Sequence, residues 1–360
     1  KARELAKLGE VMTNSQIGSR RNIILNPKMA IAQRGTSVSS ATTATFIVDR
    51  FLMQVSSLGT WTLSQSTDVP TGEGFSNSFK FDCTTANASP SAGAFLSCKQ
   101  KIEAQNLQQL KYGTSSAESV TISFYVRSNK TGTYIFELIQ PDASNRHRGA
   151  SYTINSADTW ERKVITFTGD TSGVINNDNG DGMQLTWWLG SGSNFSSGTL
   201  QTDWGALSQA DRAVGNVNLA DSTDNEWYIT GVQMEVGSYP NGTPFEHRSF
   251  GEELALCQRY YFGSTYGDST PGSTGAFGTA HSTNEANVGF EFPTTMRATP
   301  TVTVFDASGN ANRIHRAQVG DHGNSANANN VNVNGVGQLQ SSSMTTGGGY
   351  LSGINADAEL

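Results

Sequence analysis

Aromatic side chains on the polar face of a predicted strand are the residues best suited to binding a ligand. In MQLTWWL (183–189), the two-residue alternation of a strand groups Trp187 with the apolar side chains and Trp188 with the polar ones. A ring on a sheet face can stack on a sugar, and it can also pack beneath a loop or against another subunit. Tyr125 in SVTISFYVR (119–127) has the same ambiguity. Subunit packing or loop cover is the favoured interpretation of Trp188, and a ligand-binding platform is the alternative. If a ligand is bound, we expect its contacts at Trp188, Tyr125 and Trp204.

Oxygen-bearing side chains gather in the loop VINNDNGDGM (174–183). Hard cations bind several oxygens from one tight loop, so Asn177, Asp178, Asn179 and Asp181 form a candidate site for a structural calcium ion. The spacing departs from the EF-hand pattern and lacks its closing bidentate Glu. A plain Asn/Asp/Gly turn is the favoured interpretation. No other metal or cofactor is expected.

The segment PFEHR (244–248) places an apolar ring beside three charged or titratable side chains. We expect Phe245 to close the bottom of a sandwich and Glu246 to form a structural ion pair with Arg248. A catalytic Glu246–His247 pair is disfavoured, because no nucleophile or second carboxylate lies near it in the sequence.

Motifs of the common enzyme classes do not occur in this sequence. There is no G-x-S-x-G elbow, no H-E-x-x-H and no glycine loop of the kind that holds phosphates. This favours a protein that is not an enzyme. Glycoside hydrolysis needs two carboxylates at a fixed separation, which scattered Asp and Glu neither establish nor exclude. A polysaccharide depolymerase therefore remains an alternative.

The elements that must position these residues are predominantly strands. Segments rich in β-branched and aromatic residues recur between Gly, Asn, Asp and Ser clusters, at 45–55, 74–83, 94–103, 119–128, 133–140, 160–168, 183–189 and 226–237. So many strands without intervening helices predict an all-β chain with a sandwich of the jelly-roll type. We place this jelly-roll domain at residues 22–250.

Helical patterns occur at two places only. The spacing of Leu5, Leu8 and Met12 predicts a short N-terminal helical connector at residues 1–21. A second helix, linking two β domains at residues 251–263, is predicted with Ser249 as N-cap and Gly263 as C-cap. Beyond it, residues 264–360 are rich in Gly and Asn and predict a small C-terminal β tip. Its apolar area is small, so burial of valine faces between three copies is expected to stabilise it.

Composition excludes several classes of partner. The formal net charge is −7 and the pI is about 5.3, which disfavours binding to nucleic acid through its phosphates. No run of the ~20 apolar residues that a membrane helix needs is present, so membrane insertion is not expected.

Three cysteines without C-x-x-C spacing indicate free buried thiols in a reducing compartment, with a Cys83–Cys98 bridge as the alternative.

Two segments resemble bacteriophage tail-fibre and related virion proteins. The first comprises RRNIILNPKMAIAQRGTS (20–37) with the expected strand IVDRF (47–51), and the second is EWYITGVQMEVGSYPNGTPFEHRSFGEELALCQRYY (226–261). The likeness of FPTTMRATPTVT (292–303) to the small β module that follows in such proteins extends the resemblance over most of the chain.

This resemblance implies a carbohydrate-binding-like jelly roll, a homotrimer and a place on the virion exterior. It implies a structural tail fibre that mediates recognition of the host surface and adsorption, assembled in the host cytoplasm. The implied partners are sister copies, other tail or head proteins through the N-terminal segment, and a glycan or protein of the host surface. A virion adaptor or head decoration protein without a receptor role is a further alternative.

Overall fold

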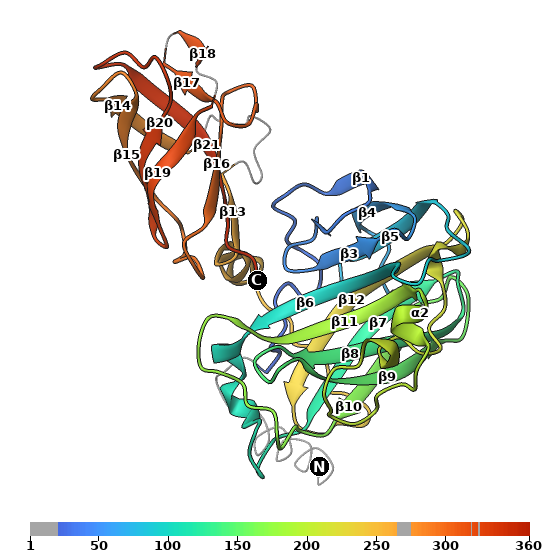
Figure 1. Ribbon diagram of the computed structural model, residues 1–360. Helices are drawn as coiled ribbons and strands as arrows, with labels where there is room; N and C mark the ends of the chain where they lie inside the picture. The colour runs from blue at the N-terminus through green and yellow to red at the C-terminus, as the bar shows by residue number, and fades with distance from the viewer. Residues whose placement is uncertain (1–20, 265–274, 318, 323–324) are drawn as a thin grey trace. The chain divides into compact units, whose positions relative to one another are not determined.

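A computed structural model describes residues 21–264, 275–317, 319–322 and 325–360. The predicted N-terminal helix lies outside these residues, apart from Arg21. The chain divides into two compact units, shown in Figure 1. One contains the residues up to Ala30 together with Ser37–Arg248, and the other contains Ile31–Thr36 together with Ser249–Leu360. No helix within the described ranges is long and apolar enough to cross a membrane.

The first unit is a sandwich of two six-stranded antiparallel sheets. One sheet, here the A sheet, has the order β1 (Ser37–Ala41), β4 (Thr60–Ser66), β5 (Ser78–Thr85), β12 (Glu226–Val236), β7 (Val120–Ser128), β10 (Glu161–Phe167). The other, the B sheet, has the order β2 (Thr45–Phe46), β3 (Leu52–Ser56), β6 (Phe95–Glu103), β11 (Asp181–Ser191), β8 (Gly132–Gln140), β9 (Arg146–Ile154). The predicted all-β jelly-roll class is confirmed.

The core lies between the two sheets and consists of alternate side chains from each strand. Trp187 of β11 is fully buried, and its ring centroid lies 4.9 Å from that of Phe136 and 5.7 Å from that of Phe124 on the opposite sheet. Burying a large apolar side chain contributes about 1.5–3 kcal/mol, so this aromatic cluster fixes which face of each strand points inward.

The segment predicted as one strand at 45–55 is interrupted, which corrects that prediction. Residues between β2 and β3 form a turn in which the Phe51 amide donates to the Val48 carbonyl at 3.1 Å. Arg50 takes a left-handed backbone conformation with φ 70° and donates to the Lys101 carbonyl at 2.7 Å. The side-chain bond offsets the backbone strain, so D-R-F is a turn here rather than a strand.

The cysteines are free and buried, as the free-thiol interpretation predicted. Cys83 lies on β5 in the A sheet and Cys98 lies on β6 in the B sheet, so the alternative bridge is not formed.

After the sandwich, the chain enters the second unit at the helix α3 (Phe250–Gln258). The Ser249 side chain accepts from the Glu252 amide at 3.3 Å, so the predicted N-cap is confirmed. The predicted C-cap at Gly263 is wrong, because the helix ends at Gln258 and Tyr261–Gly263 forms the strand β13. Pairing of β13 with β21 (Gly349–Asp357) satisfies backbone groups that a longer helix would otherwise hold.

A nine-stranded antiparallel sheet forms the rest of this unit. Its main path is β18 (Gly320–His322), β17 (Ile314–Arg316), β21, β14 (Ala276–Ala280), β15 (Glu285–Glu291), β20 (Gly335–Gln340), β19 (Asn327–Asn332), with β13 and β16 (Thr301–Phe305) also on β21. It has a core of its own around Val304, Tyr350 and Ile354. Val331 and Val333 pack partly against this core, so part of the valine surface expected to be buried between copies is covered within the chain.

The Q-R-G-T turn belongs to this second unit although it precedes the sandwich in sequence. Gln33 donates to the Tyr261 carbonyl at 2.6 Å. Arg34 lies 3.6 Å from the centre of the Tyr261 ring and pairs with Asp357 at 3.1 Å. Segment 31–36 is thereby attached to the residues that directly follow α3.

Candidate functional site

Trp188 lies on the outer face of the B sheet, as the alternation predicts, but its side chain is only 2% exposed. The segment after β11, which includes α2 (Ser193–Ser196) and the 3-10 turn η2 (Gln209–Asp211), folds over it. Figure 1 shows α2 in front of β11, and the two elements are in contact. Of the interpretations of Trp188, loop cover is therefore the one that the structure shows, and an open ring platform is not formed.

Tyr125 and Trp204 lie elsewhere. Tyr125 is on the A sheet, where its hydroxyl donates to Glu73 at 2.6 Å and its ring packs against Phe75. Trp204 lies in the segment after β11, and its indole N–H donates a hydrogen bond to the Thr168 carbonyl at 2.8 Å. The three aromatic candidates therefore do not form one surface, because Trp188 and Tyr125 belong to different sheets.

The residues of the candidate calcium loop are directed to different partners. Asp178 accepts from the Gly180 amide at 2.8 Å within its own turn. Asp181 begins β11, where it accepts from Gln184 at 2.6 Å and lies 3.7 Å from the Lys101 ammonium. Asn177 and Asn179 are exposed. Across the part of the chain that the structure describes, no three His, Cys, Asp or Glu side chains are arranged to hold a metal. The turn interpretation fits these contacts.

Glu246 and Arg248 both hold the first residues of the sandwich. Glu246 accepts from the backbone amides of Arg21 and Asn22, at 3.3 and 2.6 Å. Arg248 donates to the carbonyls of Asn22 and Ile24, at 2.5 and 2.8 Å. Their main structural role is thus to join segment 21–24 to segment 246–248. Phe245 is half-buried and packs edge-on against Phe75, 4.9 Å away, outside the main core.

The outer face of the B sheet carries polar residues in register across three central strands. Thr186 on β11 lies between Lys99 on β6 and Glu137 on β8. One row further along, Trp188 lies between Ser97 and Ile135. Because the inward residues of these strands are fixed by the aromatic core, every residue of these rows must point outward.

Glu137 is fully buried and is the centre of a hydrogen-bond network under the covering segment. Its carboxylate accepts from Arg212 Nε and Nη2, each at 2.9 Å, from the Trp188 indole at 3.0 Å, and is 2.8 Å from His147 Nδ1. The Ser208 amide donates to His147 Nε2 at 3.4 Å, so Nδ1 carries the proton toward Glu137. Burial alone would raise the pKa of Glu137, but His147 and Arg212 outweigh burial and lower it.

Lys99 lies beside this network and is 7% exposed. Its ammonium donates to Gln184 Oε1 at 2.8 Å. Burial, and next the nearby Arg212 charge, lower the pKa of Lys99 to about 8. The neighbouring Thr186 is 1% exposed, and its hydroxyl has no hydrogen-bond partner among the described residues. A buried hydroxyl left in this state costs about 1–3 kcal/mol, which makes the position unusual.

A small pocket of about 130 Å³ opens at this point between the sheet and its cover. Its lining combines three aromatic rings with polar and cationic groups: Gln54, Phe95, Ser97, Lys99, Thr186, Trp188, Phe195, Gln209 and Arg212. Phe195, from α2, packs against Phe95 and Trp188 with both ring centroids at 5.4 Å. The pocket thus has apolar walls and a polar base, a composition typical of ligand sites.

The covering segment is held by specific contacts, although Gly and Ser dominate its first residues, G-S-G-S-N-F-S-S-G (190–198). The Thr199 amide donates to Asp211 at 2.8 Å, and the Ala213 amide donates to the Phe195 carbonyl at 2.8 Å. A Cβ at Gly198 would lie 1.8 Å from Asp211 Oδ1, so a larger residue there would displace the carboxylate that accepts from the Thr199 amide. The wall of the pocket is therefore a built part of the fold.

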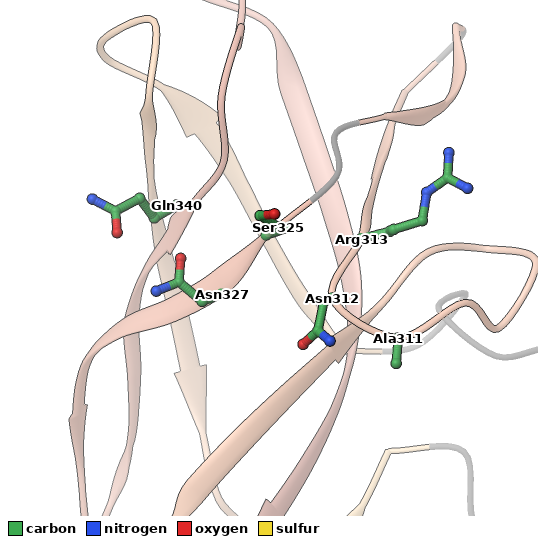
Figure 2. A pocket seen from close by; sticks show the side chains of 7 residues that line it. Ala311, Asn312, Arg313, Ser325, Asn327 and Gln340 are labelled. Carbon is green, nitrogen blue, oxygen red and sulfur yellow. The ribbon is translucent and has the colours of Figure 1, made fainter.

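A larger hollow of about 780 Å³ lies on the second unit, lined by Ala311, Asn312, Arg313, Ser325, Ala326, Asn327 and Gln340. Figure 2 shows the guanidinium of Arg313 extending away from the amides of Asn327 and Gln340. Arg313 Nε lies 3.3 Å from Asp306. The polar groups that line this hollow do not converge, and none of its lining residues is aromatic. The pocket on the B sheet is therefore the better candidate site.

Sequence reasoning missed Lys99, Glu137, Arg212 and Phe195. Their convergence depends on the register of three strands and on where the segment after β11 folds back, and neither can be read from spacing. One signal was present: Glu137 stands alone among apolar residues in TYIFELIQ (133–140). A single acid in such a strand predicts a buried charge that needs a partner.

No family model matches the chain, and no curated protein matches it. Among solved structures, the enzymatically active domain of bacteriophage CBA120 tailspike protein 4 matches 60% of this chain and 21% of its own, at 12% identity and TM-score 0.32. A putative sugar-binding protein from Bacteroides thetaiotaomicron covers 60% of this chain and 99% of its own, at 13% identity and TM-score 0.32. A family 4 carbohydrate-binding module covers 51% and 77%, at 13% identity and TM-score 0.27. The matched segment thus spans about a fifth of the tailspike chain.

Proposed function

We propose that this chain is a non-enzymatic component of a phage tail fibre that recognises a glycan on the host surface. The observation that carries this proposal is the pocket on the B sheet, where aromatic walls surround buried polar groups. Rings that flank directed hydrogen-bonding groups suit a sugar, which has apolar ring faces and a polar edge.

The family-like segments support a place in the virion. Glu246 and Arg248 of one segment hold residues 21–24 of the other, and Gln33 and Arg34 hold the strand that follows α3. The residues that resemble those of tail-fibre proteins are thus the ones that hold segment 21–24 and the strand β13 in place. The N-terminal segment is proposed to attach the chain to other tail or head proteins.

Binding rather than hydrolysis is the better reading of the pocket. No Asp or Glu is among its lining residues, and the nearby Glu137 is already held by Arg212, Trp188 and His147. Glycoside hydrolysis requires two available carboxylates. The depolymerase alternative would be favoured if host capsule or lipopolysaccharide released new reducing ends on incubation with the protein.

Binding of fluorescently labelled full-length protein to host cells tests the proposal. Binding should survive protease treatment of the cells and disappear after periodate oxidation of their glycans. Phe195→Ala should weaken binding about tenfold through loss of one ring contact, roughly 1.4 kcal/mol.

Phe277→Ala is the matched control, because this ring is 59% exposed on the second unit. If Phe277→Ala weakens binding and Phe195→Ala does not, the second unit is the recognition site instead. A wild-type protein that binds no host cells but binds another virion component would favour the adaptor alternative.

We further propose that three copies assemble side by side, which would raise the avidity of weak single sites. Sedimentation at micromolar concentration should give the mass of three chains. A folded single chain under these conditions would overturn the trimer and leave the glycan proposal standing.

A further inference from the structure

The charge in the pocket on the B sheet is not balanced. Of the residues lining it, Lys99 and Arg212 are cationic and none is acidic. Arg212 already has a counter-charge, because it donates two hydrogen bonds to Glu137. Lys99 has an amide oxygen as its partner, and no ion pair to it is formed among the described residues.

The nearest carboxylates are committed elsewhere. Asp181 is occupied by Gln184 and by Lys101. Glu137 is surrounded by Arg212, the Trp188 indole and His147. An ammonium has three N–H donors, and Lys99 directs one of them to Gln184. The charges of Glu137 and Asp181 stabilise the ammonium, but burial outweighs them and lowers the pKa of Lys99 to about 8. A ligand that places an anion in direct contact with Lys99 is therefore favoured here.

Thr186 provides an independent sign of a ligand at the same place. Its hydroxyl is buried, lies in the lining of the pocket and has no partner among the described residues. Thr186 is the cross-strand neighbour of Lys99. A hydroxyl donor and an ammonium donor side by side match the two oxygens of a carboxylate.

The size and walls of the pocket narrow the class of anion. A volume of about 130 Å³ equals about four waters at roughly 30 Å³ each, which admits a carboxylate and the adjoining part of a ring. Phe195 and Trp188 give this ring an apolar wall, and Gln54, Ser97 and Gln209 offer hydrogen bonds to hydroxyls. A free inorganic anion would make no use of the aromatic wall.

We propose that the pocket takes the carboxylate of an acidic sugar residue, held by Lys99 and Thr186, with the sugar ring against Phe195 and Trp188. This inference rests on the proposed function and names its ligand class.

The test compares two sugars that share one ring, methyl glucuronide and methyl glucoside, in calorimetric titrations of the full chain at pH 7. N-acetylneuraminate and inorganic phosphate serve as further probes. We expect at least one of the two sugar acids to bind, and the glucuronide to bind at least about tenfold more tightly than the glucoside if it is the preferred acid.

Variants separate the role of the charge from that of the fold. Lys99→Met keeps the length of the stem and should abolish binding of the acid. Lys101→Met is the matched control on the same strand, because that ammonium faces Asp181 and does not line the pocket. Thr186→Val should weaken binding of the acid about fivefold to tenfold, since the hydroxyl donor is replaced by a methyl group.

Each outcome decides the inference. Equal binding of acidic and neutral sugars, or no binding of either acid, overturns it, as does tight phosphate binding with no sugar bound. Host-cell binding that persists in Lys99→Met also overturns it and leaves the proposed function intact. Acid binding by a protein that does not bind host cells would uphold this inference and refute the proposed function.

Discussion

The guanidinium of Arg212 forms two hydrogen bonds to the carboxylate of Glu137, from Nε and from Nη2, each at 2.9 Å. Glu137 lies on β8 of the B sheet, paired with Thr186 of β11, and Arg212 lies in the segment that covers that sheet. The Arg212 guanidinium also lies 4.9 Å from the centre of the Trp188 ring. This one pair therefore attaches the wall of the pocket to its floor.

Glu137→Gln should lower the free energy of unfolding by about 3 kcal/mol, because it leaves Arg212 largely buried without a counter-charge. Denaturant unfolding followed by tryptophan fluorescence measures this, and all six tryptophans fall between Trp61 and Trp227, in the first unit. Glu118→Gln is the control: its exposed pair with Lys111 should contribute less than about 1 kcal/mol. Equal losses in the two variants would contradict the role of the pair.

The same pair predicts how stability depends on pH. The folded-state pKa of Glu137 is lowered below the unfolded value of about 4.3, despite burial, by His147 and Arg212. A lowered pKa stabilises the fold above the unfolded pKa, and this contribution is lost as the pH falls. Unfolding of wild type and Glu137→Gln should therefore differ most at pH 7 and converge from about pH 5 downward. A difference that stays constant from pH 7 to pH 3 would contradict this assignment.

How far the sequence predicts this structure depends on the range of the interactions involved. Local chemistry was sufficient at Ser249, where one hydroxyl and the amide three residues later define the start of α3. It was insufficient at Gly263, because pairing with a strand about ninety residues later overrides a local helix stop. Local chemistry was also insufficient at Asp49–Phe51, where the Lys101 carbonyl of β6 accepts a hydrogen bond from Arg50 and so holds the turn.

The candidate site shows the same division. Alternation correctly placed Trp188 on the outer face of its strand, since that depends only on its neighbours in sequence. Whether the ring is open or covered depends on Phe195 and Arg212, which reach it by a fold of the chain. Lys99, Thr186 and Glu137 come together only through register between strands.

The cysteines should be unreactive in the folded protein. Burial raises the pKa of Cys83 to about 11 and raises that of Cys98 further above its usual range, so the reactive thiolate is scarce at pH 8. A disulfide reagent that reports thiols by colour should react slowly with the native protein. It should report all three thiols once guanidinium unfolds the chain without reductant. Fewer than three thiols in the unfolded chain would indicate a bridge and contradict the structure.

Thr186→Val should stabilise the free protein, by about 1 kcal/mol, although most substitutions at buried positions destabilise. The hydroxyl of Thr186 is buried without a partner among the described residues, so a methyl group of similar size removes a cost and loses no bond. Thr121→Val is the matched control in the A sheet. Its buried hydroxyl bonds to the Gly237 carbonyl at 2.8 Å and to the Thr166 hydroxyl at 3.0 Å, so the same change there should destabilise by about 1–3 kcal/mol. Denaturant midpoints followed by tryptophan fluorescence decide between them. If Thr186→Val destabilises as much as Thr121→Val, the Thr186 hydroxyl is satisfied in the free protein and is not kept for a ligand.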